Sequence, residues 1–308
     1  MRSDFVRELT AAMQERSDIF FLTGDLGFRA LEPLQQNFPD RFVNVGVAEQ
    51  NLASVGAGLA MTGRKVFIYS IASFVTLRCF EQIRDDICYH NLDVTIVGTG
   101  GGFNYGHLGV THHTVEDLAM FRALPNMKVF CPGYGWEAAA ITRALVAGRG
   151  PAYLRLGKSP GKDLSRPGFD FAVGRGFAVK DGDAAVLFAT GNMLMTAIEI
   201  AKRLENESGL SAGVVSIPCL KPLDRELIIS KARRARGLFT LEEHNVIGGL
   251  GSAVAETLAE AGVQPPVFHS FGIPDTFIAA VGNRAFLCAQ AGLGTETILQ
   301  QIKERMKI

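Results

Sequence analysis

The sequence predicts an α/β protein with two doubly wound domains, each a parallel sheet that helices cover on both faces. With 308 residues, the chain is longer than one typical domain. Short apolar runs alternate with amphipathic stretches, which is the pattern of βαβ units. The segment 157–176 is rich in Gly, Pro, Ser and charged residues and is typical of a linker. We therefore expect one domain at 1–165 and a second at 175–308.

The first half opens with an amphipathic helix, "MRSDFVRELTAAMQERSD", and continues with five predicted strands. Each strand is an almost continuous apolar run, as expected when both faces of a parallel sheet are buried. A helix is predicted over 76–90, because apolar residues recur there on one face at helical spacing. The strands are "DIFFLTG" (18–24), "KVFIYS" (65–70), "DVTIVG" (93–98), "MKVFCP" (127–132) and "AYLRLG" (152–157).

The second half shows the same alternation on a smaller scale. Strands are predicted near 184–191, 212–218 and 237–243, with helices at about 192–206 and 251–262. This pattern favours a second, smaller α/β unit.

The composition excludes several classes of protein. The chain is 47% apolar and carries 31 basic and 31 acidic residues, with no basic run of five, so we expect no nucleic-acid or membrane partner. The five cysteines are scattered without a CxxC pair, which indicates neither a disulfide framework nor a zinc site. The amino-terminal helix does not resemble a signal peptide, and no apolar stretch is long enough to span a bilayer. We expect a cytoplasmic protein.

One carboxylate stands at the head of a small and apolar segment. This is Glu49 in "NVGVAEQNLASVGAGLAMTG" (44–63), whose later small residues would let another backbone approach closely. Glu49 could simply complement the dipole of a first helical turn. Alternatively, it is a carboxylate buried at an interface, where a raised pKa would let it share a proton with a heterocycle nitrogen.

A glycine-rich loop and two histidines follow a predicted strand in "GTGGGFNYGHLGVTHHTVEDLAMFRALPNM" (98–127). Thr114 with Asp117 forms a weak helix-capping signature, which places His112 and His113 just before a helix. Free backbone N–H groups and imidazoles at such a position suit a phosphate or an oxyanion. Polar filling of a loop is the alternative. The glycines do not form the GxGxxG fingerprint of a dinucleotide site.

Taken together, the motifs resemble the C-terminal half of transketolases over nearly the whole chain. The resemblance implies a thiamine-diphosphate pyrimidine-binding domain followed by a transketolase C-terminal domain, and a carbon–carbon transfer reaction. The motifs that carry it are "NVGVAEQN", "SFVTLRCFEQIR", "GVTHHTVEDLAMFRALPNM", "YLRLGK" and "TLEEHNVIGGLGSAVAE".

The resemblance assigns cofactor contacts to four residues. It implies that Glu49 bonds to pyrimidine N1′ of thiamine diphosphate, and that Phe74 stacks on the aminopyrimidine ring. Because the segment from Phe74 looks one residue longer than in some relatives, Phe80 is a second candidate for this aromatic. Asp25 and Leu26 match an acid near the cofactor and an apolar wedge beneath its bent form.

Substrate contacts follow from the family motif D-G-x-T-H. His112 matches its histidine, which contacts substrate hydroxyls or phosphate and is also the second catalytic candidate. Leu108 replaces its aspartate and cannot accept a hydrogen bond, which predicts an unusual or modified sugar. His113, or His107, would then compensate for the lost contact.

A phosphate contact is implied further along the chain. Lys158, or else Arg155, lies where relatives carry a phosphate-binding arginine. Lysine there would offer a point charge without the bidentate fork of arginine.

The resemblance also implies a partner chain. The family holds the diphosphate through Mg²⁺ with a G-D-G motif and a following Asn, and this sequence has no such pair in its first domain. We therefore expect Mg²⁺ on a companion subunit with the diphosphate-binding domain, and homodimerisation within an α2β2 heterotetramer. The activity expected is transfer of a two-carbon ketol unit from a phosphorylated ketose to an aldehyde. The alternatives are a 1-deoxyxylulose-5-phosphate synthase-like subunit, a 2-oxoacid dehydrogenase β-type subunit and a non-catalytic α/β assembly subunit.

Overall fold

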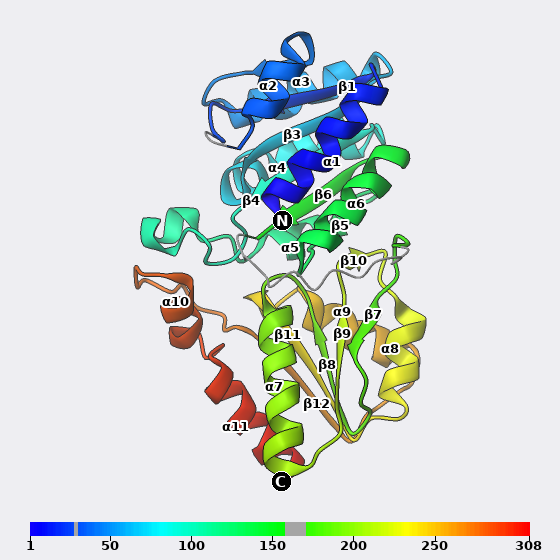
Figure 1. Ribbon diagram of the computed structural model, residues 1–308, viewed down its shortest axis with the longest axis vertical. Helices are drawn as coiled ribbons and strands as arrows, with labels where there is room; N and C mark the ends of the chain where they lie inside the picture. The colour runs from blue at the N-terminus through cyan, green and yellow to red at the C-terminus, as the bar shows by residue number, and fades with distance from the viewer. Residues whose placement is uncertain (28–29, 158–170) are drawn as a thin grey trace.

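The computed structural model describes residues 1–27, 30–157 and 171–308, and within them the chain forms two α/β domains. Figure 1 shows the two sheets one above the other along the long axis of the molecule. None of the described helices is both long and apolar enough to cross a membrane. The predicted fold class, with two doubly wound domains, is confirmed.

The upper domain is built on a seven-stranded sheet of order β10-β5-β6-β4-β3-β1-β2. All neighbours are parallel except β10 and β5, so the sheet needs helical crossovers on both faces. The strands are β1 (Ile19–Thr23), β2 (Phe42–Asn44), β3 (Lys65–Ile71), β4 (Val94–Thr99), β5 (Lys128–Phe130), β6 (Ala152–Leu156) and β10 (Cys219–Lys221).

Helices cover the upper sheet in two layers. On one face α1 (Arg2–Glu15), α2 (Glu32–Asn37) and α6 (Gly135–Ala147) bury Phe5, Leu34 and Ile141. On the other face lie α3 (Glu49–Met61), α5 (Asp117–Ala123) and the segment Phe74–Cys88. Short 3₁₀ helices are found at Pro39–Arg41, Gly106–Leu108 and Val110–His112.

The segment predicted as one helix over 76–90 is divided in the structure. Two π-helical stretches, Phe74–Arg78 and Ile83–Cys88, flank a short α-helix, α4 (Phe80–Gln82). A π turn takes one residue more than an α turn. The apolar residues Ile83 and Ile87 remain buried in this geometry.

The lower domain has a five-stranded sheet of order β12-β11-β8-β9-β7, in which only β7 is antiparallel to its neighbour. Its strands are β7 (Phe177–Lys180), β8 (Ala185–Ala189), β9 (Ala212–Ser216), β11 (Gly237–Asn245) and β12 (Val267–Ile273). Its helices are α7 (Met193–Ser208), α8 (Arg225–Ala232), α9 (Leu250–Glu260), α10 (Arg284–Gln290) and α11 (Thr295–Met306).

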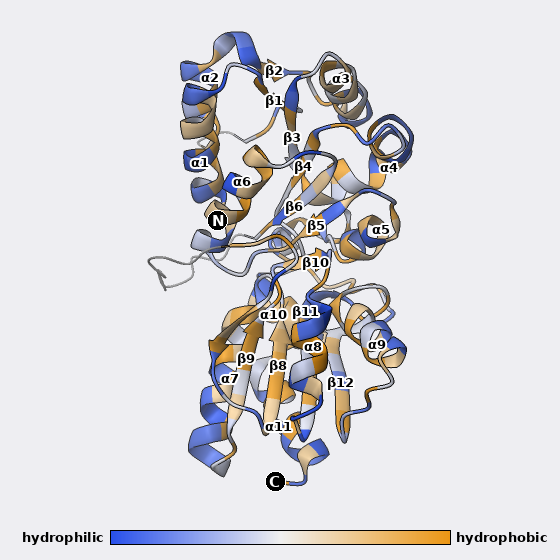
Figure 2. Cartoon of the chain, turned by 90° about the vertical axis from the view of Figure 1, so that its right-hand side faces the viewer, coloured by the Kyte–Doolittle hydropathy of each residue, from blue (hydrophilic) through white to orange (hydrophobic). Residues whose placement is uncertain are grey.

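The two domains are joined by more than the linker. Strand β10 comes from the second half of the sequence yet pairs with β5 at the edge of the upper sheet. Apolar contacts also continue across the boundary, because Cys131 of the upper domain and Phe188 of the lower belong to one buried cluster. Figure 2 shows the strands of both sheets as the hydrophobic centre of each domain.

Candidate active site

Glu49 is the first residue of α3 and is only 5% exposed. A turn at Gly46, which has φ of +77°, leads from β2 into this helix. No side chain caps the helix, so the carboxylate lies at the positive end of its dipole, as the simpler interpretation expected. Because this carboxylate is buried, its charge needs a partner within the protein.

The neighbour that holds it is Arg78, which the sequence reasoning did not single out. One guanidinium nitrogen, Nη1, donates a hydrogen bond of 3.1 Å to Glu49 Oε2. The guanidinium carbon also lies 4.0 Å from the centre of the Phe74 ring, a cation–π contact. The Arg78 side chain is 51% exposed, whereas Glu49 lies deeper. Arg78 therefore lies between the acid and the aromatic that the resemblance assigned to one cofactor ring.

His112 completes this group on the other side of Phe74. The ring centroids of Phe74 and His112 are 4.9 Å apart in an edge-to-face arrangement. Thr111 Oγ1 lies 3.0 Å from His112 Nδ1. Burial, and then the charges of His107 and Arg78, lower the pKa of His112, so the imidazole is neutral at pH 7. A neutral ring can donate from one nitrogen and accept at the other.

Phe80 faces away from this group. Its ring stacks at 6.3 Å on Phe121, and it packs against the buried core cluster behind Phe74. Cys79, between Arg78 and Phe80, is fully buried, and burial raises the pKa of its thiol to about 12. Phe74 is thus the aromatic that accompanies Glu49, and the thiol is inert.

The residues of the family's substrate motif lie on a loop beside His112. Leu108 is 47% exposed, and His107 is exposed next to it. His113 is only 5% exposed and packs edge-to-face on Phe103. Leu108 therefore faces solvent, where a ligand could reach it, whereas His113 is mostly buried.

Asp25 and Leu26 lie elsewhere, after the carboxyl end of β1. Asn44 binds both the backbone N–H and the carboxylate of Asp25, at 2.9 and 3.0 Å. Together with Leu31 these residues line a small pocket. Among the described residues that line it, neither Glu49 nor Phe74 is found. Within this chain, the two residues are thus not brought together with the Glu49 group.

Arg155 is not placed to bind a phosphate. It is 4% exposed, and its Nε lies 2.9 Å from the buried carboxylate of Asp117. Its Nη2 donates to the backbone carbonyls of Thr114 and Glu243. We correct the expectation for Arg155 because its guanidinium is buried between the two domains and paired with Asp117. Lys158, the other candidate, lies outside the described residues.

The helix-capping signature of Thr114 and Asp117 is also wrong, because Asp117 is part of the buried pair with Arg155. Helix α5 begins at Asp117, but the Asp117 carboxylate accepts from Tyr153 and pairs with Arg155 instead of capping. The glycines before it make room for this buried cluster. A Cβ atom on Gly101 would lie 2.3 Å from Arg155 Nε, and one on Gly102 would lie 2.4 Å from Glu243 Oε1. The loop is shaped by packing between the domains.

The "EEH" stretch of β11 forms the opposite half of this interface, and its side chains alternate between the strand's two faces. Glu243 accepts from the backbone N–H of Phe103 at 2.7 Å and from Arg284 at 2.6 Å. Glu242 accepts from Leu250 and Gly251 at the start of α9. Sequence reasoning treated this motif only as part of the resemblance.

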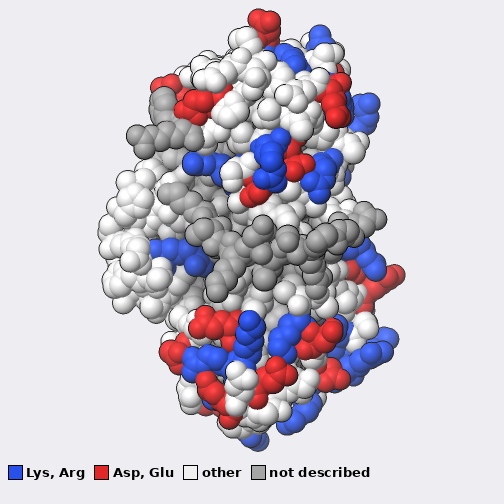
Figure 3. Space-filling model, in the orientation of Figure 1, with Lys and Arg blue, Asp and Glu red and all other residues white. Residues whose placement is uncertain are grey.

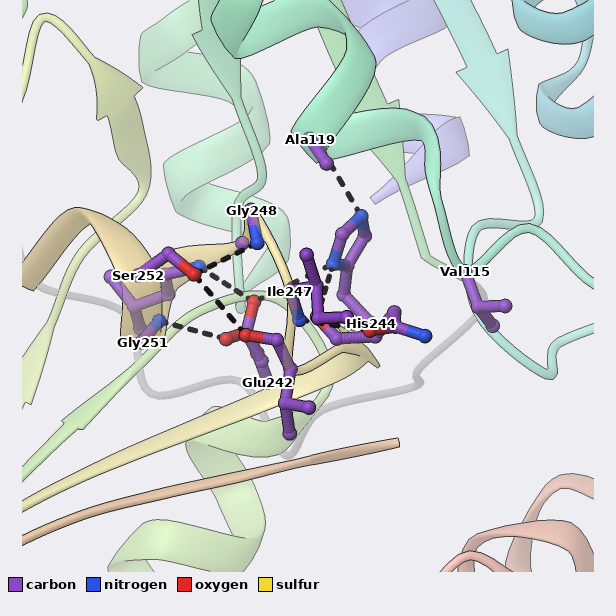
Figure 4. Close-up of polar contacts among 12 residues, drawn as sticks. Val115, Ala119, Glu242, His244, Ile247, Gly248, Gly251 and Ser252 are labelled. Carbon is purple, nitrogen blue, oxygen red and sulfur yellow. Dashed lines mark hydrogen bonds and ion pairs between the residues drawn. The ribbon is translucent and has the colours of Figure 1, made fainter. Parts of the chain in front are cut away.

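His244 lies beside Glu242 and holds the start of α5. Its Nε2 accepts from the backbone N–H of Ala119 at 3.3 Å, and its Nδ1 lies 2.7 Å from the carbonyl of Asn245 (Figure 4). Burial lowers the pKa of His244 to about 4 and raises that of Glu242 to about 7. A neutral imidazole therefore caps α5, which the sequence signature had assigned to Thr114.

The group around Glu49 fits a flat ring that can form hydrogen bonds, because a flat cation already lies there. Arg78 stacks on Phe74 and hydrogen-bonds to Glu49, the two residues that an aminopyrimidine ring would contact. No cluster of three or more His, Cys, Asp or Glu suited to a metal ion occurs in the described parts of the chain.

Comparisons with known proteins cover almost the whole sequence. The profile of the transketolase pyrimidine-binding domain matches residues 1–162, and that of the transketolase C-terminal domain matches 174–298. A putative transketolase C-terminal section from Methanocaldococcus jannaschii is 34% identical, covering 100% of this chain and 96% of the relative. An apulose-4-phosphate transketolase subunit from Actinobacillus succinogenes is 31% identical, over 96% of this chain and 94% of that one.

A solved structure agrees with these relatives. It is described as a split gene transketolase, inactive beta4 tetramer, and is 38% identical to this chain. The TM-score is 0.89, with 99% of this chain and 98% of the other covered.

Proposed function

This chain belongs to the transketolase family, and on that premise we propose that it supplies the pyrimidine pocket of a split transketolase. The reaction proposed is transfer of a two-carbon ketol unit from a phosphorylated ketose to an aldehyde. The observation that carries the proposal is the arrangement of Glu49, Phe74 and His112, with a flat cation held between the first two.

Each of these residues has a definite task. When bound, thiamine diphosphate would supply the carbon nucleophile that the reaction needs. Glu49 would hold a proton and share it with pyrimidine N1′, and this hydrogen bond is stronger for a buried carboxyl group than for one in water. Phe74 would support the ring face. Neutral His112 would donate to or accept from a substrate oxygen at the nitrogen turned away from Thr111.

A companion subunit is part of the proposal. Two related proteins, described as a transketolase C-terminal section and a split gene transketolase, support it. So does an apolar lobe beside His112, where the segment 106–110 packs against 281–287. Figure 3 shows this lobe on the left of the molecule as a surface with few charges. Its exposed apolar residues are Leu108, Val110, Phe277, Val281 and Phe286.

That lobe suits burial against another chain in an α2β2 assembly, since exposed apolar patches mark interaction sites. The companion would hold the diphosphate through Mg²⁺. All five cysteines are buried and free, which supports a reducing compartment such as the cytoplasm.

The substrate is proposed to differ from the usual pentose phosphates near one hydroxyl. Leu108 is exposed beside His112 and offers no hydrogen-bond acceptor from its side chain. A relative that is 31% identical is named for a different sugar, apulose-4-phosphate. Both observations support a sugar phosphate in which one hydroxyl is absent or altered, namely the hydroxyl that would hydrogen-bond to the aspartate at the position of Leu108.

The decisive experiment measures ketol transfer by the chain purified together with its companion subunit. Glu49→Ala is expected to lower turnover by about 10²–10⁴-fold, because proton sharing with the ring is lost. Glu81→Ala is the matched control, an exposed acid on the same layer of helices, and should leave turnover unchanged.

Other outcomes would redirect the proposal. Turnover that requires pyruvate and releases CO₂ would favour a synthase of the 1-deoxyxylulose-5-phosphate type. Full activity of Glu49→Ala would remove the assigned role of Glu49. A complex without cofactor binding would favour a non-catalytic assembly subunit.

A further inference from the structure

We propose that Arg78 occupies the aminopyrimidine position in the free subunit, so that the cofactor must displace it to reach Glu49 and Phe74. The inference rests on the proposed function, because it takes these two residues as the ring-binding pair. It adds a competitor within the same chain, a side chain that holds the ring site closed until the cofactor takes its place.

The chemistry of a guanidinium makes it a good substitute for the ring. It is flat and delocalised, it stacks on aromatic faces, and it carries N–H donors in its own plane. Arg78 uses both properties at once, since it lies 4.0 Å above the Phe74 centroid and donates to Glu49 at 3.1 Å. One face of Phe74 cannot stack on two flat groups at the same time, so the ring and the guanidinium exclude each other there.

The position of Arg78 also allows it to leave. Its side chain is half exposed, at 51%, and within the described parts of the chain it makes no further ion pair or hydrogen bond. An ion pair and a cation–π contact whose cation reaches water are each weak, because water competes for the cation. Displacement thus requires a rotation of one side chain into water and no opening of the core.

The pairing explains how a buried carboxylate is kept neutralised before the cofactor arrives. Glu49 is 5% exposed, and in the free chain Arg78 is its ion-pair partner. When the ring enters, a proton shared between Glu49 and a ring nitrogen replaces the N–H of Arg78, so Glu49 is hydrogen-bonded in both states. The free chain should therefore bind the isolated ring weakly, and removing Arg78 should strengthen that binding.

The test is a calorimetric titration of the full-length chain with 4-amino-5-hydroxymethyl-2-methylpyrimidine, the ring without its charged tail. Arg78→Met keeps the length of the side chain but removes the planar cation. It should bind the ring about threefold to thirtyfold more tightly than the native chain, as expected when one exposed ion pair and one cation–π contact no longer compete. Arg84→Met is the matched control, an exposed arginine paired with Asp85, and should bind like the native chain.

A second measurement needs no substitution at Arg78. The Nε–H signal of Arg78 in the NMR spectrum of the native chain should move toward that of a solvated arginine as the ring is added. Equal or weaker binding by Arg78→Met, or an unmoved signal at saturation, would overturn the competition.

The variant Glu49→Ala separates this inference from the proposed function. If Glu49→Ala abolishes ring binding while Arg78→Met does not strengthen it, the pocket is correct and only the competition fails. If the ring binds Glu49→Ala as well as it binds the native chain, or binds no variant, the pocket itself is wrong and the competition falls with it.

Discussion

Two arginine–carboxylate pairs in two regions of the molecule show how burial changes the structural role of an ion pair. At the mouth of the candidate site, Arg78 lies 3.1 Å from Glu49, with exposed side-chain fractions of 51% and 5%. Between the domains, Arg155 lies 2.9 Å from Asp117, with fractions of 5% and 0%. The distances are nearly equal, but one guanidinium reaches water and the other does not. The first pair can exchange its partner, and the second holds the structure together.

The neighbours of each arginine reinforce this difference. Arg155 also donates to two backbone carbonyls, from Thr114 and Glu243, so losing it would leave several buried groups without a partner. Arg78 adds only the stacking on Phe74. Leaving a buried charge unpaired is costly, and the cost is smaller for Glu49, where water can replace the half-exposed guanidinium.

The strongest way to break the comparison is to remove Arg155. We expect Arg155→Met to lower the free energy of unfolding by about 3–5 kcal/mol, because it leaves Asp117 buried without its cation. Denaturant unfolding measures this loss. The double variant Asp117→Asn with Arg155→Met should lose less, since no buried charge remains. A single variant as stable as the native chain would show that the interdomain pair is dispensable.

The pH dependence of the interdomain region gives the next largest effect. The folded-state pKa of His244, about 4, lies below its ordinary value of 6.5. As the pH falls from 6.5 to 4, the unfolded chain takes up a proton that the folded chain refuses, so stability falls by about 3 kcal/mol. Glu242 acts in the opposite direction, because its raised pKa makes stability rise as the pH falls from 7 toward 4.5.

The contribution of His244 is therefore measured as a difference from His244→Gln, whose amide can still accept from Ala119. The stability of this variant relative to the native chain should rise by about 3 kcal/mol between pH 7 and pH 4. Parallel pH profiles would mean that His244 does not titrate as its burial requires.

At Leu108, which faces solvent beside the candidate site, a substitution should change the substrate preference and leave the stability unchanged. Leu108→Asp restores an acceptor at an exposed position, so it should favour ordinary pentose phosphates by about 1–3 kcal/mol in kcat/KM. The companion complex is assayed with both kinds of sugar. Leu77→Asp, at another exposed apolar residue of the upper domain, serves as a control for the added charge. An unchanged substrate profile would contradict the role given to Leu108.

The smallest effect is expected for the stability of Arg78→Met. Its free energy of unfolding should fall by only about 1–2 kcal/mol, because water can enter where the half-exposed guanidinium lay and the helix dipole still favours Glu49. Thermal and denaturant unfolding both measure it. A loss as large as that of Arg155→Met would erase the distinction between the two pairs.

Much of the fold could be predicted from the sequence, because parallel strands that are buried on both faces consist of nearly continuous apolar residues. The predicted strand 65–70 corresponds to β3 and the predicted helix 192–206 to α7. Strand β10 was not predicted, since its three residues pair antiparallel with β5 across the domain boundary. Local sequence carries no signal for a partner so distant along the chain.

The site was predictable only in part. Glu49, Phe74 and His112 could be named because motif residues of a family can be matched one by one. Arg78 was missed and Arg155 was given a ligand-binding role, because only three-dimensional burial shows which arginine is accessible. The capping role of His244 was missed for a similar reason, as its partner Ala119 is 125 residues away.

Strand β10 has a practical consequence for anyone who divides this protein. Because Cys219–Lys221 closes the edge of the upper sheet, a fragment ending at the predicted boundary near 165 would present β5 with unpaired backbone groups. Open edges of this kind promote self-association. A truncation at this boundary would therefore report on a sheet that has lost its β10 strand instead of on an intact domain.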